Sequence, residues 1–189
     1  MKTFSSDKTK ILLISDIHND VYKLDKILTK EAADINICLG DWWDSFYLDA
    51  TSDYEKVTDY LINTYLAKDN NYTLFGNHDL HYLFVNEFVQ CSGFEERKFE
   101  AIENVFKNQR TPIRNKFLWY CMVDDILLTH AGLDQRLVPS SAKTNADIYE
   151  YLDKSVDEAN SKIVSNQNHW FYQVGAYRGG AFKIGRAHV

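Results

Sequence analysis

Hydrophobic and polar positions along the first eighty residues predict strands and helices in turn. Short apolar runs at residues 10–15, 34–39 and 72–75 are typical of buried strands. Between these runs, apolar residues recur at helical spacing over residues 21–32 and 54–66. The order strand–helix–strand–helix–strand predicts a largely parallel sheet with right-handed crossover connections.

The rest of the chain predicts further helices and an antiparallel addition to the sheet. Two helical segments, broken near Ser92 and Gly93, are expected within residues 80–107. Residues 117–123 and 126–129 should form a hairpin around Asp124 and Asp125. A long helix is expected over residues 145–164. No element is assigned to residues 166–180. We therefore expect an α/β (α+β) fold, a layered β-sandwich flanked by helices.

Each predicted strand, and the hairpin, ends in a cluster of polar residues. The clusters are Asp16-Ile17-His18, Gly40-Asp41-Trp42-Trp43-Asp44, Gly76-Asn77-His78-Asp79 and His130-Ala131-Gly132. Ligand sites in open α/β sheets lie at the carboxyl ends of strands, so the clusters should converge. Carboxylates and imidazoles suit Mn, Fe or Zn, and one carboxylate can bridge two such ions. Strand-end capping and turn chemistry would explain one or two of these positions, but not the set.

The motifs D-x-H, G-D-x-x-D, G-N-H-D and H-A-G, in this order over residues 16–132, resemble the calcineurin-like metallophosphoesterase superfamily. The H-A-G form is most similar to its branch of phosphoprotein phosphatases and diadenosine tetraphosphate hydrolases. The resemblance implies two divalent metal ions held by five side chains. Asp16 and His18 would bind the first ion, Asp41 would bridge both, and Asn77 and His130 would bind the second.

The same resemblance implies a mechanism. A hydroxide formed from water between the two ions would attack phosphorus in line. His78 would act as general acid or phosphate contact, with Asp44 orienting it, and Asn77 would also lie against the substrate. The substrate would be a phosphoprotein, a nucleotide or another phosphoester. A structural role for His78 and a helix N-cap role for Asp44 are the alternatives.

The chain departs from the branch at two positions. Asn19 stands where Gly usually follows D-x-H, and Ser45-Phe46 stands where Arg-Gly usually follows the second aspartate of G-D-x-x-D. That arginine normally contacts phosphate. Arg178, within Y-R-G-G, is the candidate to replace it, because the guanidinium fork suits phosphate; a plain backbone turn is the alternative.

Other conspicuous side chains near the motifs are given weaker roles. His81 matches no ligand position of the family and is expected on a helix face near the rim of the site. Trp42 and Trp43 either line the cleft or pack in the core. His169 and Trp170 are expected to be structural.

Composition narrows the partners. With 27 acidic and 21 basic residues the net charge is −6, which disfavours nucleic acid and anionic membranes as partners. No apolar run approaches the ~20 residues that span a bilayer, and the N-terminus lacks a signal-peptide core. Three scattered cysteines read as reduced thiols, so we expect a cytoplasmic enzyme without a membrane partner.

The last residues look artificial. Back-translated as AAG ATC GGA AGA GCA CAC GTC, residues 183–189 match a common short-read sequencing adapter whose next bases give a stop. We therefore expect a truncated single domain over residues 1–183 and a non-native tail over residues 184–189. The family's C-terminal G-H motif, which supplies another ligand to the second ion, is absent before this tail. The alternatives to an active hydrolase are accordingly a binding scaffold with little catalysis, or an inactive truncated form.

Overall fold

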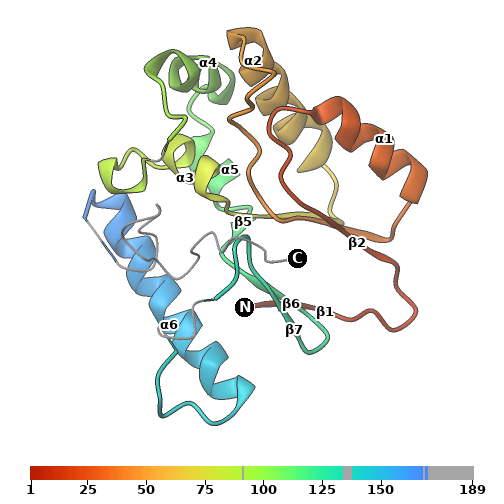
Figure 1. Ribbon diagram of the computed structural model, residues 1–189, viewed down its shortest axis with the longest axis vertical. Coiled ribbons are helices and arrows are strands. Elements are labelled where there is room, and N and C mark those ends of the chain that lie inside the picture. Colours follow the sequence, from red (N-terminus) through yellow and green to blue (C-terminus); the bar gives the residue numbers. More distant parts are fainter. Residues whose placement is uncertain (91, 134–137, 168, 170–189) are drawn as a thin grey trace.

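A parallel sheet of four strands forms the centre of the protein. The computed structural model describes residues 1–90, 92–133, 138–167 and 169. Within them the strand order is β2 (Ile11–Ile14), β3 (Ile35–Cys38), β4 (Asn71–Leu74) and β5 (Phe117–Leu118). All three neighbouring pairs are parallel, and α1 (Val21–Glu31) and α2 (Thr51–Tyr60) connect the first three strands (Figure 1). The predicted strand–helix order is confirmed.

The two connecting helices begin and end where local chemistry favours it. The Asp20 side chain accepts the Lys23 N–H at 3.0 Å and caps α1, whose apolar stripe buries Leu24. α2 begins three residues before the predicted start and continues into a π-helical segment, η1 (Leu61–Tyr65). The Tyr65 hydroxyl donates to the Tyr72 carbonyl at 2.9 Å, which ties the end of this segment to β4.

A second, three-stranded sheet has the order β1 (Lys2–Phe4), β6 (Cys121–Val123) and β7 (Ile126–Leu128). β6 and β7 are antiparallel, as the predicted hairpin requires, whereas β1, which was not predicted, pairs in parallel with β6. The prediction of one strand over residues 117–123 is wrong. The chain changes sheets at Trp119 and Tyr120, so that β5 belongs to the first sheet and β6 to the second.

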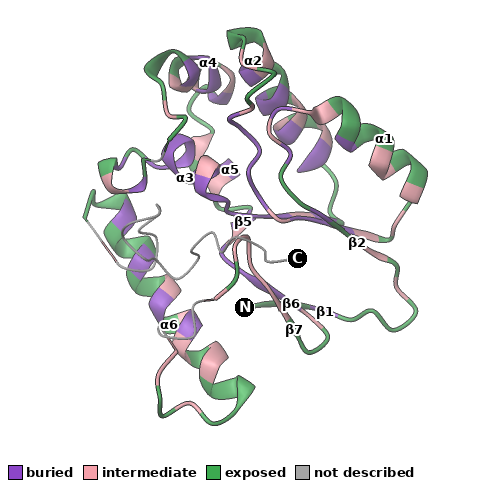
Figure 2. Ribbon diagram, viewed as in Figure 1, coloured by how far each residue is buried: buried purple, intermediate pink, exposed green. Residues whose placement is uncertain are grey.

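Two apolar clusters hold the layers together. Phe4, Ile37, Leu74 and Cys121 pack between the two sheets. A larger cluster lies on the helix-covered side of the parallel sheet, where purple buried segments face inward in Figure 2. It includes Trp42 and Trp43, both 0% exposed, whose indole N–H groups donate to Thr73 and Thr58. The core alternative for these tryptophans is therefore right, and the cleft alternative is wrong.

Four further helices and a 3₁₀ turn complete the described part of the chain: α3 (Asn77–Leu83), η2 (Glu87–Val89), α4 (Glu96–Phe106), α5 (Arg110–Arg114) and α6 (Asn145–Val164). α3 begins three residues earlier than expected, immediately after β4. The long helix α6 is confirmed, and Asn86 Nδ2 donates to the Ile163 carbonyl at its end at 2.9 Å. Among the described residues, no helix combines the length and apolar character needed to cross a bilayer. Trp170, Arg178 and the tail at residues 184–189 lie outside the described residues.

Candidate metal centre

The loops after β2 and β3 carry an unusual run of left-handed backbone conformations. Asp16, His18, Asn19, Asp41 and Asp44 have φ angles of 41°, 44°, 66°, 56° and 66°. Side chains other than glycine seldom adopt these angles, and such strain concentrates at functional sites. The same loops contain the polar clusters expected at the strand ends, so strained backbone positions the candidate ligands.

The first predicted ligand group is brought together as expected. Ligand atoms of Asp16, His18 and Asp41 all lie within 4.8 Å of one another. His18 Nδ1 lies 3.0 Å from the Trp43 carbonyl oxygen, which can only accept, so Nδ1 carries the hydrogen. Nε2 is thereby directed toward Asp41, with 3.8 Å to Oδ2. A backbone carbonyl on one ring nitrogen is the usual way to orient a metal-binding histidine.

The second predicted group uses the same device. His130 Nδ1 lies 2.8 Å from the Leu39 carbonyl oxygen, and its Nε2 lies 3.2 Å from Asn77 Oδ1 and 3.4 Å from Asp41 Oδ2. Burial lowers the pKa of His130, but its hydrogen bond to Asp41 and the charge of that carboxylate outweigh burial and raise the pKa to about 9. In the metal-free chain a proton therefore lies between them, where a divalent ion would take its place.

Asp41 is the residue common to both groups. Its side chain is nearly buried, and Oδ2 lies near both histidine Nε2 atoms. Burial opposes its ionisation, yet the hydrogen bond and charge of His130, with help from His78, hold the pKa of Asp41 below its usual range. An ionised carboxylate between two imidazole groups, with Asp16 and Asn77 at either side, fits a site for divalent ions that prefer oxygen and nitrogen ligands.

A family model described as calcineurin-like phosphoesterase matches residues 9–184. The chain belongs to this family. A Saccharomyces cerevisiae protein serine/threonine phosphatase with similarity to human phosphatase PP5 is 17% identical with a TM-score of 0.51, over 78% of this chain and 45% of that one. This likeness confirms the fold. A candidate diadenosine tetraphosphatase is 18% identical with a TM-score of 0.44, over 78% of this chain and 60% of that one.

This calcineurin-like phosphoesterase chain thus spans about half the length of the solved structures that it matches. No curated protein matches it significantly. The carboxylate, imidazole and amide groups described above are the candidate metal ligands of this family member.

In this family member the predicted proton donor and its partner are in contact. His78 Nδ1 lies 2.8 Å from Asp44 Oδ2, and the His78 backbone N–H donates to Asp41 Oδ1 at 2.9 Å. Burial opposes the ionisation of Asp44, but hydrogen bonds from His78, His81 and Tyr82 outweigh it and hold the pKa of Asp44 well below its usual range. Because the ionised carboxylate can only accept, His78 Nδ1 donates. The His78 ring lies 5.5 Å from that of His18, so this pair adjoins the first ligand group.

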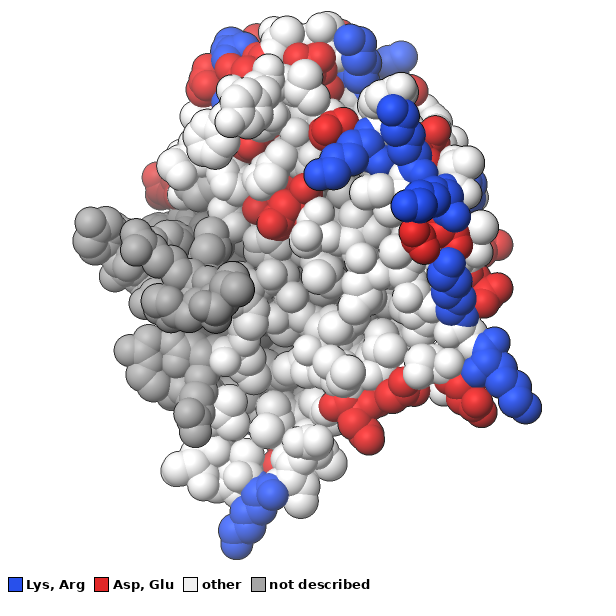
Figure 3. Space-filling view, turned by 45° about the vertical axis from the view of Figure 1, so that its right-hand side comes forward, with Lys and Arg blue, Asp and Glu red and all other residues white. Residues whose placement is uncertain are grey.

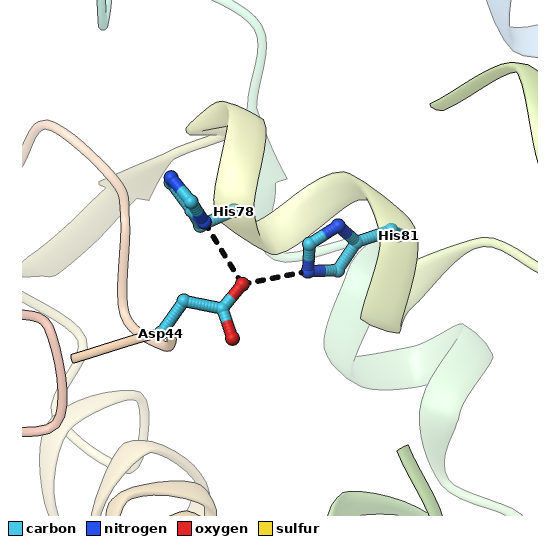
Figure 4. A group of neighbouring side chains, drawn as sticks. All are labelled: Asp44, His78 and His81. Carbon is cyan, nitrogen blue, oxygen red and sulfur yellow. Dashed lines mark hydrogen bonds and ion pairs between the residues drawn. The ribbon is translucent and has the colours of Figure 1, made fainter. Parts of the chain in front are cut away.

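The expectation for His81 is right about the helix, since His81 belongs to α3, but wrong about the rim. Its side chain is 0% exposed, and its Nε2 lies 3.0 Å from the same Asp44 oxygen that contacts His78 (Figure 4). The reason is the early start of α3, which places residues 78 and 81 on one helix face. On the other side of the carboxylate, the Tyr82 hydroxyl donates to Oδ1 at 2.7 Å and Lys98 Nζ lies 3.7 Å from it. Only the spacing of the two histidines could have indicated this cluster.

Sequence reasoning also missed Asp79, the last residue of G-N-H-D. Its fully buried carboxylate accepts the backbone N–H groups of Asp41, Trp42 and Gly76 at 2.9, 2.7 and 2.8 Å. Burial and the charge of Asp41 raise the pKa of Asp79 to about 6, against the N–H groups that favour its charged form. The turns after β3 and β4 are closely packed, because a Cβ at Gly40 would lie 2.5 Å from the Gly76 nitrogen. Asp79 therefore fastens the two ligand-bearing turns to each other.

The two departures from the family pattern have structural counterparts. Asn19 adopts the left-handed conformation that glycine favours, and its Nδ2 donates to the Leu48 carbonyl at 2.6 Å. Ser45 Oγ accepts the N–H groups of Tyr47 and Leu48, each at 3.1 Å, and this turn leaves Phe46 97% exposed. The proposed replacement for the phosphate-binding arginine lies outside the described residues, so that assignment stays a prediction.

A cavity of about 420 Å³ opens beside the first ligand group. Its lining includes Asp16, His18, Lys23 and Tyr47. Lys23 thus places a cationic side chain within the same cavity as two candidate ligands. On the face seen in Figure 3, Lys and Arg side chains are interspersed with Asp and Glu.

Proposed function

We propose that this protein is a phosphoester hydrolase that uses two divalent metal ions. The observation that carries the proposal is the placement of Asp41 between two histidines, each oriented by a backbone carbonyl on Nδ1. Asp16, His18 and Asp41 would hold one ion, and Asn77, His130 and Asp41 the other. When bound, the ions would supply an activated water and neutralise charge on the phosphoryl oxygens.

The chain's own groups complete the chemistry. His78 donates Nδ1–H to Asp44, so a second proton at Nε2 makes it an imidazolium that Asp44 stabilises. That Nε2 proton passes to the leaving oxygen as the bond to phosphorus breaks. Figure 4 shows the second nitrogen of His78 directed away from Asp44, as this role requires. Asn77, beside His130, lies where it can contact a phosphoryl oxygen as well as an ion.

For the substrate we propose a phosphorylated protein or a nucleotide. The yeast structure that shares this fold is named as a protein serine/threonine phosphatase, which favours a phosphoprotein. Lys23 in the adjoining cavity supplies a positive charge that suits either. A panel of phosphopeptides, dinucleoside polyphosphates and single-stranded nucleic acid separates them by kcat/KM. Preferential cleavage of nucleic acid would contradict this assignment.

The direct test is hydrolysis of p-nitrophenyl phosphate by the purified chain with added Mn²⁺, Zn²⁺ or Fe²⁺. We expect metal-dependent release of phosphate by the wild type and none by Asp41→Asn. Bound metal with no turnover on any substrate in the panel would overturn the proposal and favour a binding scaffold. Metal content measured after gel filtration keeps these two outcomes distinct.

A further inference from the structure

His81 lies beside the predicted proton donor rather than away from it. The two histidines are three residues apart on α3, with ring centroids 6.1 Å apart and planes perpendicular. Both reach one atom: His78 Nδ1 lies 2.8 Å and His81 Nε2 3.0 Å from Asp44 Oδ2 (Figure 4). Two imidazole nitrogens therefore contact the same carboxylate oxygen.

The two imidazoles differ in access. The His78 side chain is 18% exposed, whereas that of His81 is 0% exposed. The His81 ring packs edge-on against Tyr82, at 4.1 Å between centroids, and against Phe94 at 5.4 Å. His81 is thus held by its neighbours and closed to solvent. Its contact with Asp44 gives it a route by which it can affect His78.

The Asp44 carboxylate has donors on both oxygens. Oδ1 accepts the hydroxyl groups of Tyr82 at 2.7 Å and Tyr54 at 3.3 Å. Oδ2 lies within 3.0 Å of both imidazole groups. Removing His81 would take away the more deeply buried of these two groups, and the partly exposed His78 restrains a carboxylate less well. Two donors on one oxygen fix the plane of the carboxylate and hence the direction of its bond to His78.

We propose that His81 is a positioning residue for the proton donor: with its Nε2 3.0 Å from Asp44 Oδ2, it holds the carboxylate so that His78 Nδ1 stays bonded and His78 Nε2 stays aimed at the leaving oxygen. This role rests on the proposed hydrolase function. The same three residues could in principle hold an ion, since their ligand atoms lie within 4.8 Å of one another. The cationic Lys98 Nζ, 3.7 Å from the other Asp44 oxygen, disfavours a metal ion there.

The kinetic test compares leaving groups. Protonation matters little for p-nitrophenyl phosphate, whose leaving group is stable as an anion, and much for phenyl phosphate. We expect His81→Leu to lower kcat about tenfold on phenyl phosphate but less than about threefold on p-nitrophenyl phosphate. His81→Gln, which keeps a donor near the position of Nε2, should recover most of this loss. Leu80→Ala, a buried apolar change on the same helix, controls for destabilisation.

An equal loss on both substrates in His81→Leu, or no recovery in His81→Gln, would mean that His81 only stabilises the fold. A wild type without turnover on either substrate would instead reject the hydrolase function. The positioning role then still has a test that needs no turnover.

That second test follows the imidazole N–H protons by NMR in the metal-free, ¹⁵N-labelled chain. We expect hydrogen-bonded signals from His78 Nδ1–H and His81 Nε2–H in the wild type and neither in Asp44→Asn. In His81→Leu the remaining His78 signal should exchange with water at least about tenfold faster, because the bond opens more often. An unchanged exchange rate would overturn the proposal. A second outcome would also overturn it: Zn²⁺ binding that persists in Asp41→Asn but is lost in the double variant Asp41→Asn with His81→Leu. The cluster of Asp44, His78 and His81 would then be an ion site.

Discussion

Asp41 and Asp44 follow the same strand, yet their carboxylates have opposite surroundings. Around Asp41 the ligand atoms of His18 and His130 converge, and the His18 side chain is still 35% exposed. Around Asp44 the chain supplies its own partners, with hydrogen bonds from His78 and Tyr82 and the His81 imidazole 3.0 Å away. The first arrangement brings together side chains of several ligand types that could bind a cation, whereas in the second the carboxylate is hydrogen-bonded by groups of the chain itself. One short loop therefore contains both the carboxylate that we propose to bind ions and the carboxylate that we propose to orient a proton donor.

The strongest way to break this contrast is Asp41→Asn. Loss of the shared charge should abolish metal-dependent turnover, with a drop of at least about 10³-fold in kcat/KM. Wild-type protein should gain about 2.7 kcal/mol of unfolding free energy in Mn²⁺ at one hundred times its Kd, and Asp41→Asn should gain almost none. Thermal denaturation with and without Mn²⁺ measures this. A full Mn²⁺ shift in the variant would show that Asp41 is not a shared ligand.

His78→Ala tests the opposite side of the comparison. We expect kcat on phenyl phosphate to fall by about 10²–10³-fold, because the proton donor is lost, while the stabilisation by Mn²⁺ remains. His169→Ala serves as a matched control, since His169 lies against Glu158 of α6. Loss of Mn²⁺ binding in His78→Ala would instead make this residue a ligand.

Asp79→Asn tests whether the sites around Asp41 and Asp44 both depend on the Asp79 carboxylate, which joins the turns after β3 and β4. An amide cannot accept three N–H groups as a carboxylate does, and its own NH₂ would face a donor. We expect a loss of about 1.5–3 kcal/mol in unfolding free energy by urea denaturation, together with weaker Mn²⁺ binding. Unchanged metal affinity in a destabilised variant would show that the turns keep their spacing without Asp79.

The smallest expected effect is a pH dependence of stability from Asp44. Its folded-state pKa lies below that of the unfolded chain, about 3.9, so its contribution is full above that value and is lost as the pH falls. Each unit of pKa difference contributes about 1.4 kcal/mol. Urea midpoints measured in EDTA between pH 3 and pH 6 should rise with pH more steeply in wild type than in Asp44→Asn. Parallel curves would contradict the assignment.

Much of the fold follows from hydrophobic pattern alone. Strands β2, β3 and β4 are apolar runs bounded by polar residues, and α1 and α6 have clear helical spacing. The pattern fails where tertiary contacts decide. An unbroken apolar run cannot indicate that the chain changes sheets at Trp119. Strand β1 has only three residues, and it forms because β6, which is distant in the sequence, pairs with it.

The candidate site divides in the same way. The convergence of the candidate ligands could be predicted, because Asp16, His18 and Asp41 stand at the ends of predicted strands in a recognisable order. The residues that support them could not. Lys98 comes near Asp44 only through the packing of α4, and the role of Asp79 depends on two turns that meet in space. Three expectations stay predictions: phosphate binding by Arg178, the non-native origin of residues 184–189, and the cytoplasmic location.

The carboxylate of Asp79 has a consequence for the order of folding. Its bonds to the turn at Asp41 and Trp42 join residues that are 38 and 37 positions apart. Closing such a segment costs chain entropy that is recovered only when β3 and β4 have paired. We therefore expect the proposed ion-binding geometry to form late in folding. In a refolding experiment, Mn²⁺ should therefore bind only after β3 and β4 have paired.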